Sequence, residues 1–266
     1  MGFHSVVEIM KGEMRVIGLH GLPLVDQGDD IASLILARMR SLHLDVGDDD
    51  ILVIGHKIVS KSEGRVAKLS QVKPSARARR LAKRSRKDPR LVQLILDESV
   101  RVIKVSSGRL LVEAKQGIVC LNAGIDKSNM EDRDTCCLLP RDPNRSANRI
   151  ARRIQALTGR LVKVIITDTY SRPFRVGQTE FAIGVSGLDP FVDYRGRRDL
   201  FGRVLKFKRV SVADELASTA ELVMGQGAEG IPVAIIKGVG RIRRPSGNRA
   251  MRLAMERSND LFRGAI

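Results

Sequence analysis

The stretch Leu161-Val-Lys-Val-Ile-Ile-Thr-Asp168 is a short apolar run, rich in β-branched residues, that ends in a carboxylate. A second run, Gly117-Ile-Val-Cys-Leu-Asn-Ala-Gly-Ile-Asp126, also ends in an aspartate. Runs of this length, bounded by polar or turn residues, are typical of buried strands. The sequence therefore predicts two core strands, each with an aspartate at its tip.

These two aspartates, Asp126 and Asp168, are the candidate catalytic residues. A carboxylate at the end of a buried strand is held rigidly, which suits a hard cation such as Mg²⁺ or Mn²⁺ that prefers oxygen ligands. The alternative is that each aspartate only caps a turn. Two such residues, together with the glycine-rich segment Gly225-Gln-Gly-Ala-Glu-Gly230 downstream, favour a metal–phosphate site.

The remaining chain predicts helices and strands that do not alternate strictly. Helices are expected at about 31–42 (after Asp29 or Asp30), 75–87, 89–100, 146–157, 211–224 and from 248 onward. Strands are expected at 6–9, 14–19, 51–54, 102–105, 110–114, 180–185, 204–207 and 231–236. The segment 55–64 is expected to be a polar connection, and the segment holding Cys136 and Cys137 a loop. This order predicts an α+β fold with mixed sheets, not a doubly wound parallel sheet.

The chain is strongly basic. Its 266 residues include 47 Lys and Arg against 30 Asp and Glu, a net charge of +17 that attracts polyanions. The densest cluster lies in the predicted helix and just after it, at Arg77, Arg79, Arg80, Lys83, Arg84, Arg86, Lys87 and Arg90, and a smaller one lies at Arg241, Arg243 and Arg244. Neither cluster contains the aromatic residues that single-strand nucleic-acid binders use for base stacking. A solvated helix face and a polyanion-binding surface both remain open.

Cysteine usage and hydropathy point to a cytoplasmic protein. Cys120, Cys136 and Cys137 are odd in number and lack a C-x-x-C spacing, which argues against a disulfide framework and a zinc site. A reducing compartment is therefore expected. No apolar stretch reaches the roughly 18 residues of a membrane span, and the first residues do not resemble a signal peptide. No membrane association is expected.

The sequence contains no P-loop motif that would indicate phosphate binding directly. The spelling of Gly225 to Gly230 matches G-x-G-x-x-G, but a helix is predicted before it and a strand after it, so the dinucleotide interpretation fails. Its glycines allow backbone N–H groups to approach an anion, although a helix C-cap followed by a turn explains Gly225 equally well. Lys57 and Lys61 follow the 51–54 strand, where each is either a phosphate contact or an ordinary surface lysine.

Several segments in this order resemble the coenzyme F-420:L-glutamate ligase family, the F-420-0:gamma-glutamyl ligases. The resemblance covers about Val16 to Gly238. It is carried by Gly21-Leu-Pro-Leu-Val25, Ile58-Val-Ser-Lys-Ser-Glu-Gly-Arg65, Val119-Cys-Leu-Asn-Ala-Gly-Ile-Asp-Lys-Ser-Asn129, Ile165-Ile-Thr-Asp-Thr169, Phe181-Ala-Ile-Gly-Val-Ser-Gly187, Arg198-Asp-Leu-Phe-Gly-Arg203, Ala213-Asp-Glu-Leu-Ala217 and Met224-Gly-Gln-Gly-Ala-Glu-Gly-Ile-Pro232.

The resemblance implies a fold and an activity. Members of the family are two-domain α+β chains that form intertwined homodimers, so residues 1–240 would be the ligase region and 241–266 a basic helical tail. The implied reaction is GTP-dependent: L-glutamate is joined to the deazaflavin coenzyme F-420 precursor, and a second glutamate follows through a gamma linkage. The family uses Mg²⁺ or Mn²⁺ at two positions, and K⁺ is a further candidate cation.

The same resemblance implies roles for individual residues. Asp126 and Asp168 would be metal ligands, with Thr169 and Gln226 at a second metal position. The implied nucleotide contacts are Leu22, Pro23, Leu24, Val25, His56, Lys57, Lys61, Asn129, Met224, Gly225, Gln226, Gly227, Ala228 and Glu229. Some relatives have two small hydroxyl residues in place of His56 and Lys57, and others have an acidic residue in place of Gln226.

The implied mechanism passes through an acyl phosphate. A carboxylate needs a better leaving group before an amine can displace it, and transfer of the γ-phosphoryl group of GTP supplies one, with release of GDP and then phosphate. Two other functions stay open: a related NTP-dependent amide ligase with a different acid acceptor, and a nucleic-acid-binding protein that uses the basic helix. Arg172 and Arg175 follow Asp168 and would bind a carboxylate or phosphate, or form surface ion pairs.

Overall fold

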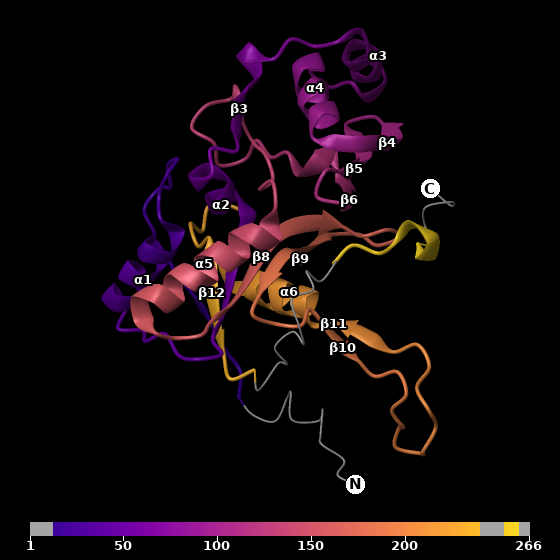
Figure 1. Cartoon of the computed structure of the whole chain (residues 1–266). Coiled ribbons are helices and arrows are strands. Elements are labelled where there is room, and N and C mark those ends of the chain that lie inside the picture. The colour runs from indigo at the N-terminus through magenta and orange to yellow at the C-terminus, as the bar shows by residue number, and fades with distance from the viewer. Residues whose placement is uncertain (1–12, 240–252, 261–266) are drawn as a thin grey trace.

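The computed structural model describes residues 13–239 and 253–260, and its centre is a five-stranded sheet (Figure 1). The strands follow the order β1 (Arg15–Gly18), β12 (Val233–Lys237), β2 (Ile51–Gly55), β8 (Lys163–Ser171) and β9 (Gln178–Ser186). β2 and β8 run parallel, whereas the other neighbours run antiparallel. This mixed sheet and its helices confirm the predicted α+β class.

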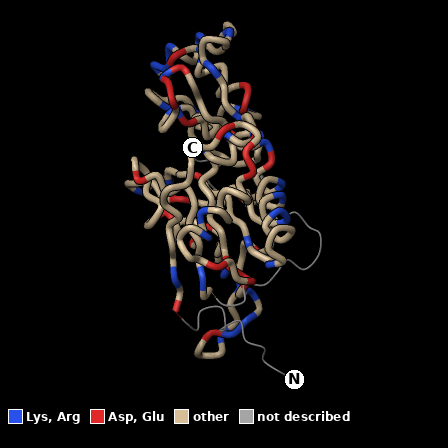
Figure 2. Tube along the Cα trace, turned by 90° about the vertical axis from the view of Figure 1, so that its left-hand side faces the viewer, with Lys and Arg blue, Asp and Glu red and all other residues tan. Residues whose placement is uncertain are grey.

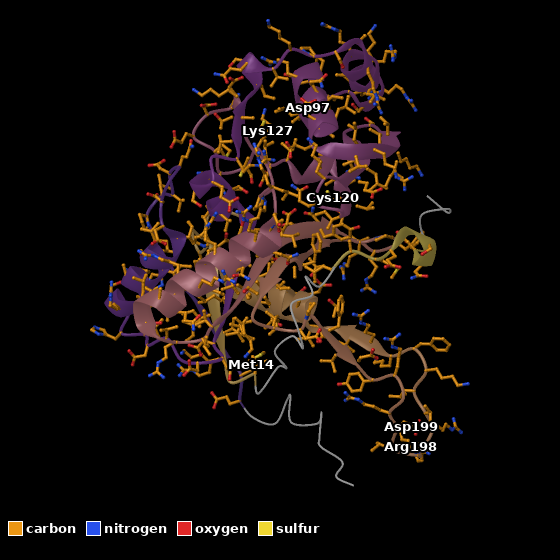
Figure 3. The ribbon with its side chains drawn as sticks, viewed as in Figure 1. Met14, Asp97, Cys120, Lys127, Arg198 and Asp199 are labelled. Carbon is orange, nitrogen blue, oxygen red and sulfur yellow. The ribbon has the colours of Figure 1, made fainter. Side chains whose placement is uncertain are left out.

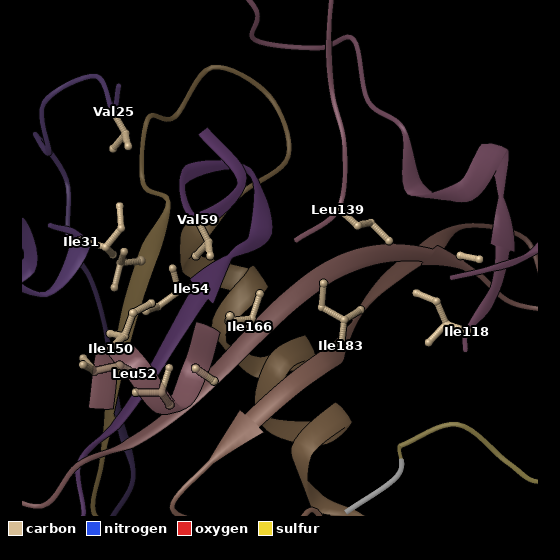
Figure 4. Close-up of a cluster of buried hydrophobic side chains, with 14 of the residues drawn as sticks. Val25, Ile31, Leu52, Ile54, Val59, Ile118, Leu139, Ile150, Ile166 and Ile183 are labelled. Atoms are coloured by element: carbon tan, nitrogen blue, oxygen red, sulfur yellow. The ribbon is translucent and has the colours of Figure 1, made fainter. Parts of the chain in front are cut away.

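The central sheet is buried on both faces. Leu52 and Ile54 of β2 join one core cluster and Ile51 and Val53 join the other, as the two-residue period of a strand requires. Helices α1 (Ile31–Ser41) and α5 (Pro143–Thr158) lie on the first face, and α6 (Val212–Met224) lies on the second (Figure 1). Figure 4 shows the first cluster, to which α5 contributes Ile150. Burial on both faces explains the unbroken apolar sequence of β2.

Local capping fixes several helix ends at the predicted positions. Asp30 accepts a hydrogen bond from the Ser33 amide at the start of α1. Ser75 and Asp88 cap α3 (Ala76–Ser85) and α4 (Pro89–Asp97) in the same way. Each cap satisfies a backbone N–H that has no partner within the helix. Gly159 ends α5 in the left-handed conformation, at φ 72°.

A second unit sits above the central sheet (Figure 1). It contains α3, α4 and the three-stranded sheet of β4 (Ser99–Ser106), β5 (Arg109–Ala114) and β6 (Val119–Leu121). A two-stranded ladder, β3 (Val66–Lys68) with β7 (Thr135–Cys137), joins it to the body. The basic side chains of α3 face outward, because only its alanine and serine positions are buried. Figure 2 shows basic and acidic stretches along the chain in both parts.

A long arm projects from the body between β10 (Phe191–Asp193) and β11 (Arg209–Ser211) (Figure 1). Arg198 and Asp199 lie near its tip (Figure 3). Leu200, Phe201 and Phe207 in the arm are 90–99% exposed. The strand predicted at 204–207 is wrong. The strand that pairs with β10 starts at Arg209, two residues after the end of the predicted one.

The predicted strand that ends at Asp126 is also wrong in extent. β6 covers only Val119–Leu121, and a 3-10 turn, η3 (Asn122–Gly124), follows it. Positive φ angles at all three residues of η3 break the extended backbone. Asp126 is instead fixed by an isolated bridge to Cys137, whose strand β7 was predicted to be a loop.

Three further predictions need correction. Asp168 lies inside β8, which continues to Ser171, and not at the tip of the strand. The polar segment after β2 is a helix, α2 (His56–Ser62). Val100, expected on the helix after Asp88, is 59% exposed in β4.

Parts of the predicted termini lie outside the described residues. These parts are the strand at 6–9 and the segments 240–252 and 261–266 of the basic tail. Between the two tail segments, residues 253–260 hold a single 3-10 turn, η4 (Arg257–Asn259), in place of the predicted α-helix. None of the helices in the described ranges is long and apolar enough to cross a membrane.

Candidate active site

A cavity of about 470 Å³ opens where the parallel pairing of β2 with β8 ends, at Gly55 and Thr167. Arg172 and Arg175 do not line it, whereas the predicted metal ligands and nucleotide contacts all do: Leu22, Pro23, Leu24, Val25, His56, Lys57, Lys61, Asp126, Asn129, Asp168, Thr169, Met224, Gly225, Gln226, Gly227, Ala228 and Glu229. We call this space the first cavity. The fold thus brings together residues that are up to 207 positions apart (229 − 22); their individual roles stay predictions.

The parallel pairing of β2 and β8 explains why these residues meet. Gly55 at the end of β2 pairs with Thr167 of β8, so the end of β2 lies beside the residues of β8 that directly precede Asp168. α2 starts there and presents His56 and Lys57, while β8 continues through Asp168. In sheets with parallel strands, the carboxyl end of a strand is a common position for ligands.

Each of the two candidate aspartates is paired with a cation-forming side chain from α2. His56 Nε2 lies 3.3 Å from Asp168 Oδ1, and Lys57 Nζ lies 2.7 Å from Asp126 Oδ2. The lysine also donates to the carbonyl and hydroxyl oxygens of Ser128, at 2.8 and 2.9 Å. The family resemblance implies that His56 and Lys57 lie at the nucleotide. In the structure His56 also contacts Asp168, and Lys57 also contacts Asp126.

The surroundings of Asp126 favour its charged form. Burial raises the pKa of this carboxyl, but hydrogen bonds from Lys57 and from the amide and hydroxyl of Ser128 outweigh burial and lower the pKa overall. The carboxylate is therefore ready to bind a cation at neutral pH without losing a proton.

Glu180 is a site residue that sequence reasoning missed. Its side chain is buried and accepts hydrogen bonds from the hydroxyl groups of Thr167 and Thr169 and from Nε2 of Gln226. Burial raises the pKa of this carboxyl, and the three hydrogen bonds offset part of that effect. The available signal was a glutamate in an otherwise apolar strand, 180–185; its partner Thr169 on β8 is fixed only by strand register.

The glycine-rich segment closes the other side of the first cavity. Gly225 ends α6 with φ at 71°, a conformation that favours glycine. The Gly227 amide donates to Glu229 Oε2 over 2.7 Å, and its carbonyl accepts from Asn129 Nδ2 over 3.1 Å. The segment therefore folds back on itself, and one of its N–H groups is already occupied by a carboxylate.

A second cavity, of about 680 Å³, meets the first at the aspartates. Both cavities are lined by Asp126, Asp168, Thr169 and Gln226. The other walls of the second cavity combine apolar side chains, including Ile103, Leu111, Val119 and Tyr170, with polar and charged ones, including Arg109, Asn122, Arg172, Gln178 and Asp260. Ligands in the two cavities would therefore meet at the carboxylates.

The donor set at this junction suits a hard divalent cation. Two carboxylates, a threonine hydroxyl and an amide oxygen are all oxygen ligands, the kind that Mg²⁺ and Mn²⁺ prefer, and Mg²⁺ usually completes its shell with water and substrate phosphate. Within residues 13–239 and 253–260, no group of three or more His, Cys, Asp or Glu is placed to hold a metal alone. A site with few protein ligands and a phosphate ligand is therefore the arrangement that fits.

The cysteines do not contribute reactive thiolates to the site. All three are buried and free. Burial raises the pKa of Cys120, which lines the second cavity, to about 12, and that of Cys137 to about 11. Both thiols stay protonated at neutral pH, and the thiolate is the reactive form.

Comparison with known proteins identifies the family. The family model for F420-0:Gamma-glutamyl ligase matches residues 21–238. A Methanothermobacter thermautotrophicus protein named Coenzyme F420:L-glutamate ligase is 48% identical, over 94% of this chain and 99% of its own length. Proteins of the same name are 46% identical in Archaeoglobus fulgidus (85% and 88% covered) and 43% identical in Methanocaldococcus jannaschii (95% and 98%). The chain is a member of the F420-0:gamma-glutamyl ligase family of enzymes.

Proposed function

We propose that this enzyme joins L-glutamate to the deazaflavin coenzyme F-420 precursor at the expense of GTP, and then adds a second, gamma-linked glutamate. The observation that carries the proposal is the meeting of two cavities at Asp126 and Asp168. A reaction between a nucleotide and an acid requires two binding sites that share one reacting centre. The relatives' names supply the acceptor and the amino acid.

The first cavity is the proposed nucleotide site. The family resemblance suggests GTP, and Lys57 and Lys61 from α2 give the cavity positive charge for its phosphates. Asp126, Asp168, Thr169 and Gln226 would hold Mg²⁺ or Mn²⁺, which neutralises charge on phosphoryl oxygens when bound. His56 and Lys57 keep the two carboxylates in place.

The second cavity is the proposed acceptor site. Its apolar side chains, such as Ile103, Leu111 and Val119, suit the flat ring system of a deazaflavin, and its junction with the first cavity would bring the acceptor carboxylate to the γ-phosphate of GTP. One carboxylate oxygen would then attack the γ-phosphorus, GDP would leave, and an acyl phosphate would form. The neutral amine of L-glutamate would displace phosphate from the acyl carbon. One of the two amine protons would pass to solvent, and the other would stay on the amide nitrogen.

We also propose a cytoplasmic homodimer. The arm residues Leu200, Phe201 and Phe207 support the dimer, because each is at least 90% exposed and a second copy could cover their apolar surface. The three free, buried thiols support a reducing compartment.

A second candidate function, polyanion binding, rests on α3. Its basic side chains Arg77, Arg79, Arg80, Lys83 and Arg84 are exposed, and they form no ion pair with any described residue. This function predicts duplex binding that weakens steeply with salt. Binding that survives neutralisation of Arg79, Arg80 and Arg84 would reject it.

The ligase proposal is tested by phosphate release from GTP with Mn²⁺, the precursor and L-glutamate, leaving out each component in turn. Mass spectrometry should find a product heavier by one or two glutamyl units. Asp168→Asn should abolish it, whereas Asp97→Asn, an exposed aspartate of α4 (Figure 3), should not. Phosphate release without glutamyl product would point to a different acid acceptor, and full activity of Asp168→Asn would reject the site.

A further inference from the structure

The Arg172 side chain lies in the wall of the second cavity, where its Nε has no hydrogen-bond partner among the described residues. It directly follows β8, four residues beyond Asp168, and its side chain is half-buried. The Nε atom itself is buried. The hydrogen bond found for its side chain among the described residues runs from Nη2 to the Val176 carbonyl, at 3.5 Å, the long limit for such a bond.

Two other arginines that are not fully exposed are paired with carboxylates. Arg65 donates to Glu98 over 2.5 Å and to the Leu139 carbonyl over 2.9 Å, and Arg90 donates to Asp88 over 2.6 Å. Arg172 is absent from the ion pairs found between residues 13–239. A buried donor left unpaired destabilises the folded protein, and does so more strongly if it is charged. The arrangement is therefore unfavourable unless a ligand supplies the acceptor.

The acidic groups on the cavity wall do not cancel this charge. Asp126 is paired with Lys57, and Asp168 with His56, both from the first cavity side. Arg109 adds a second cation to the lining. Away from the junction, the lining of the second cavity therefore carries two guanidinium groups, Arg109 and Arg172, against one carboxylate, Asp260.

The shape of the donor indicates the class of ligand. The Nε edge of a guanidinium offers two parallel N–H groups, which match the two oxygens of a carboxylate. At about 3.3 Å per strand residue, the backbone of Arg172 lies about 13 Å along the strand from that of Asp168. This separation favours a carboxylate other than the reacting one on the same set of substrates.

We propose that Arg172 binds a non-reacting glutamate carboxylate during ligation. This inference rests on the proposed function, in which glutamate carboxylates come from two sources: the free L-glutamate that enters, and the glutamyl residue already joined to the acceptor before the second addition. Both present the same planar oxyanion to the same guanidinium edge. Arg172 is thus a binding residue for the substrate, remote from the bond that forms.

The test compares Arg172→Gln with Arg175→Gln. Arg175 lies in the same segment, is exposed and lines neither cavity, so it is the matched control. Steady-state kinetics would give KM for GTP, L-glutamate and the acceptor, and fluorescence titration would give the Kd of the precursor and of its monoglutamyl form. Arg172→Lys keeps the charge but loses the paired donors, and should recover only part of the lost affinity.

Two results would support the inference and separate the sources. A rise of at least tenfold in KM for L-glutamate, with KM for GTP unchanged, identifies the free amino acid. A rise of at least tenfold in Kd for the monoglutamyl acceptor, but not for the precursor, identifies the joined residue. Folding of each variant is checked by its melting temperature, and Arg172→Lys serves if Arg172→Gln does not fold.

Two further results would overturn one proposal each. Wild-type protein that makes no glutamyl product overturns the proposed function. Wild-type activity together with an Arg172→Gln enzyme whose constants all match those of Arg175→Gln overturns the role of Arg172 alone.

Discussion

The Gln226 side chain donates from Nε2 to Oε1 of Glu180 over 2.8 Å, and this bond fixes which end of the amide faces Thr169. A carboxylate only accepts hydrogen bonds, so the amide nitrogen must point to Glu180. The amide oxygen then lies 2.8 Å from the Thr169 hydroxyl, at the junction of the cavities, and shares the single proton of that hydroxyl with Glu180 Oε1. A neutral residue thereby presents the oxygen that a hard cation needs.

Glu180→Gln should therefore weaken divalent metal binding. The new amide can donate toward Gln226, which removes the preference for the orientation with the oxygen outward. Losses of such supporting partners typically cost 10–100-fold in metal affinity. Titration of Mn²⁺ followed by electron paramagnetic resonance would measure the effect, with exposed Glu131→Gln as the control. Equal affinities in the two variants would contradict the orienting role.

Lys57→Gln should have opposite effects on the two ligands of the first cavity. The ammonium lies 2.7 Å from Asp126, so it opposes a cation there and attracts a phosphate. We expect tighter Mn²⁺ binding without nucleotide and weaker GTP binding, both by calorimetry. Lys127→Gln, beside Asp126 in sequence but exposed (Figure 3), should change neither. A loss of both affinities in Lys57→Gln would argue against this balance.

Asp30 should contribute stability that disappears in acid. Burial alone would raise its pKa, but hydrogen bonds from Ser33 and Arg153 lower the pKa overall. Because the folded pKa is lower than the unfolded one, the contribution is complete above about pH 4 and is lost as pH falls through the folded pKa. Asp30→Ala should lower the free energy of unfolding at pH 7 by about 1 kcal/mol.

The check is denaturant unfolding at pH 7 and at pH 3. The difference between wild type and Asp30→Ala should shrink at the lower pH. Asp30→Asn keeps the cap without the charge, so its effect at pH 7 should be smaller. A difference that is constant with pH would show that charge plays no part.

Gly184→Ala should be strongly destabilising. A Cβ at this position of β9 would lie 2.4 Å from the backbone carbonyl carbon of Pro143, where α5 begins. Backbone cannot move aside as a side chain can, so a cost of about 2–3 kcal/mol is expected from overpacking. Gly47→Ala is the control, because its nearest contact would be an ordinary 3.5 Å from the Asp50 side chain. Similar melting temperatures for both variants would refute the close packing of α5 on β9.

Phe201→Ser should shift the proposed homodimer toward monomers. The side chain is 90% exposed in the arm, and contact with a second copy would remove its apolar surface from water. Light scattering coupled to size exclusion would give the mass across a dilution series. Leu222→Ser, which removes an 82% exposed residue from α6, should leave the mass unchanged. A wild-type protein that is monomeric would contradict the proposed homodimer.

The sequence predicted those elements whose signals are local. α5 and α6 have clear apolar periodicity, a starting residue and a terminal glycine, so their bounds are close to the prediction. α2 was missed because it is only seven residues long and its first turn has no side-chain cap. β7 was missed because three residues become a strand only by pairing with β3, about 70 positions earlier.

The site was predicted as a set of residues and not as a set of contacts. The family segments named the lining of the first cavity, but strand register alone places Glu180 opposite Thr169. The pairing of α2 with the aspartates likewise needs the turn that starts at His56. Asp126 was predicted to be a site residue for a partly wrong reason. Its position depends on a bridge to Cys137 and not on the end of a strand.

The parallel pair β2–β8 also sets the order in which the protein can assemble. Between Gly55 and Lys163 lie 107 residues (163 − 55 − 1), including the whole upper unit, and the pairing must close that loop. Loop closure costs entropy before any contact repays it, and contacts so distant in sequence are associated with slow folding. His56 and Asp168 meet only after closure. The chemistry of this chain therefore becomes available at a late stage of folding, when the upper unit already has its own local contacts.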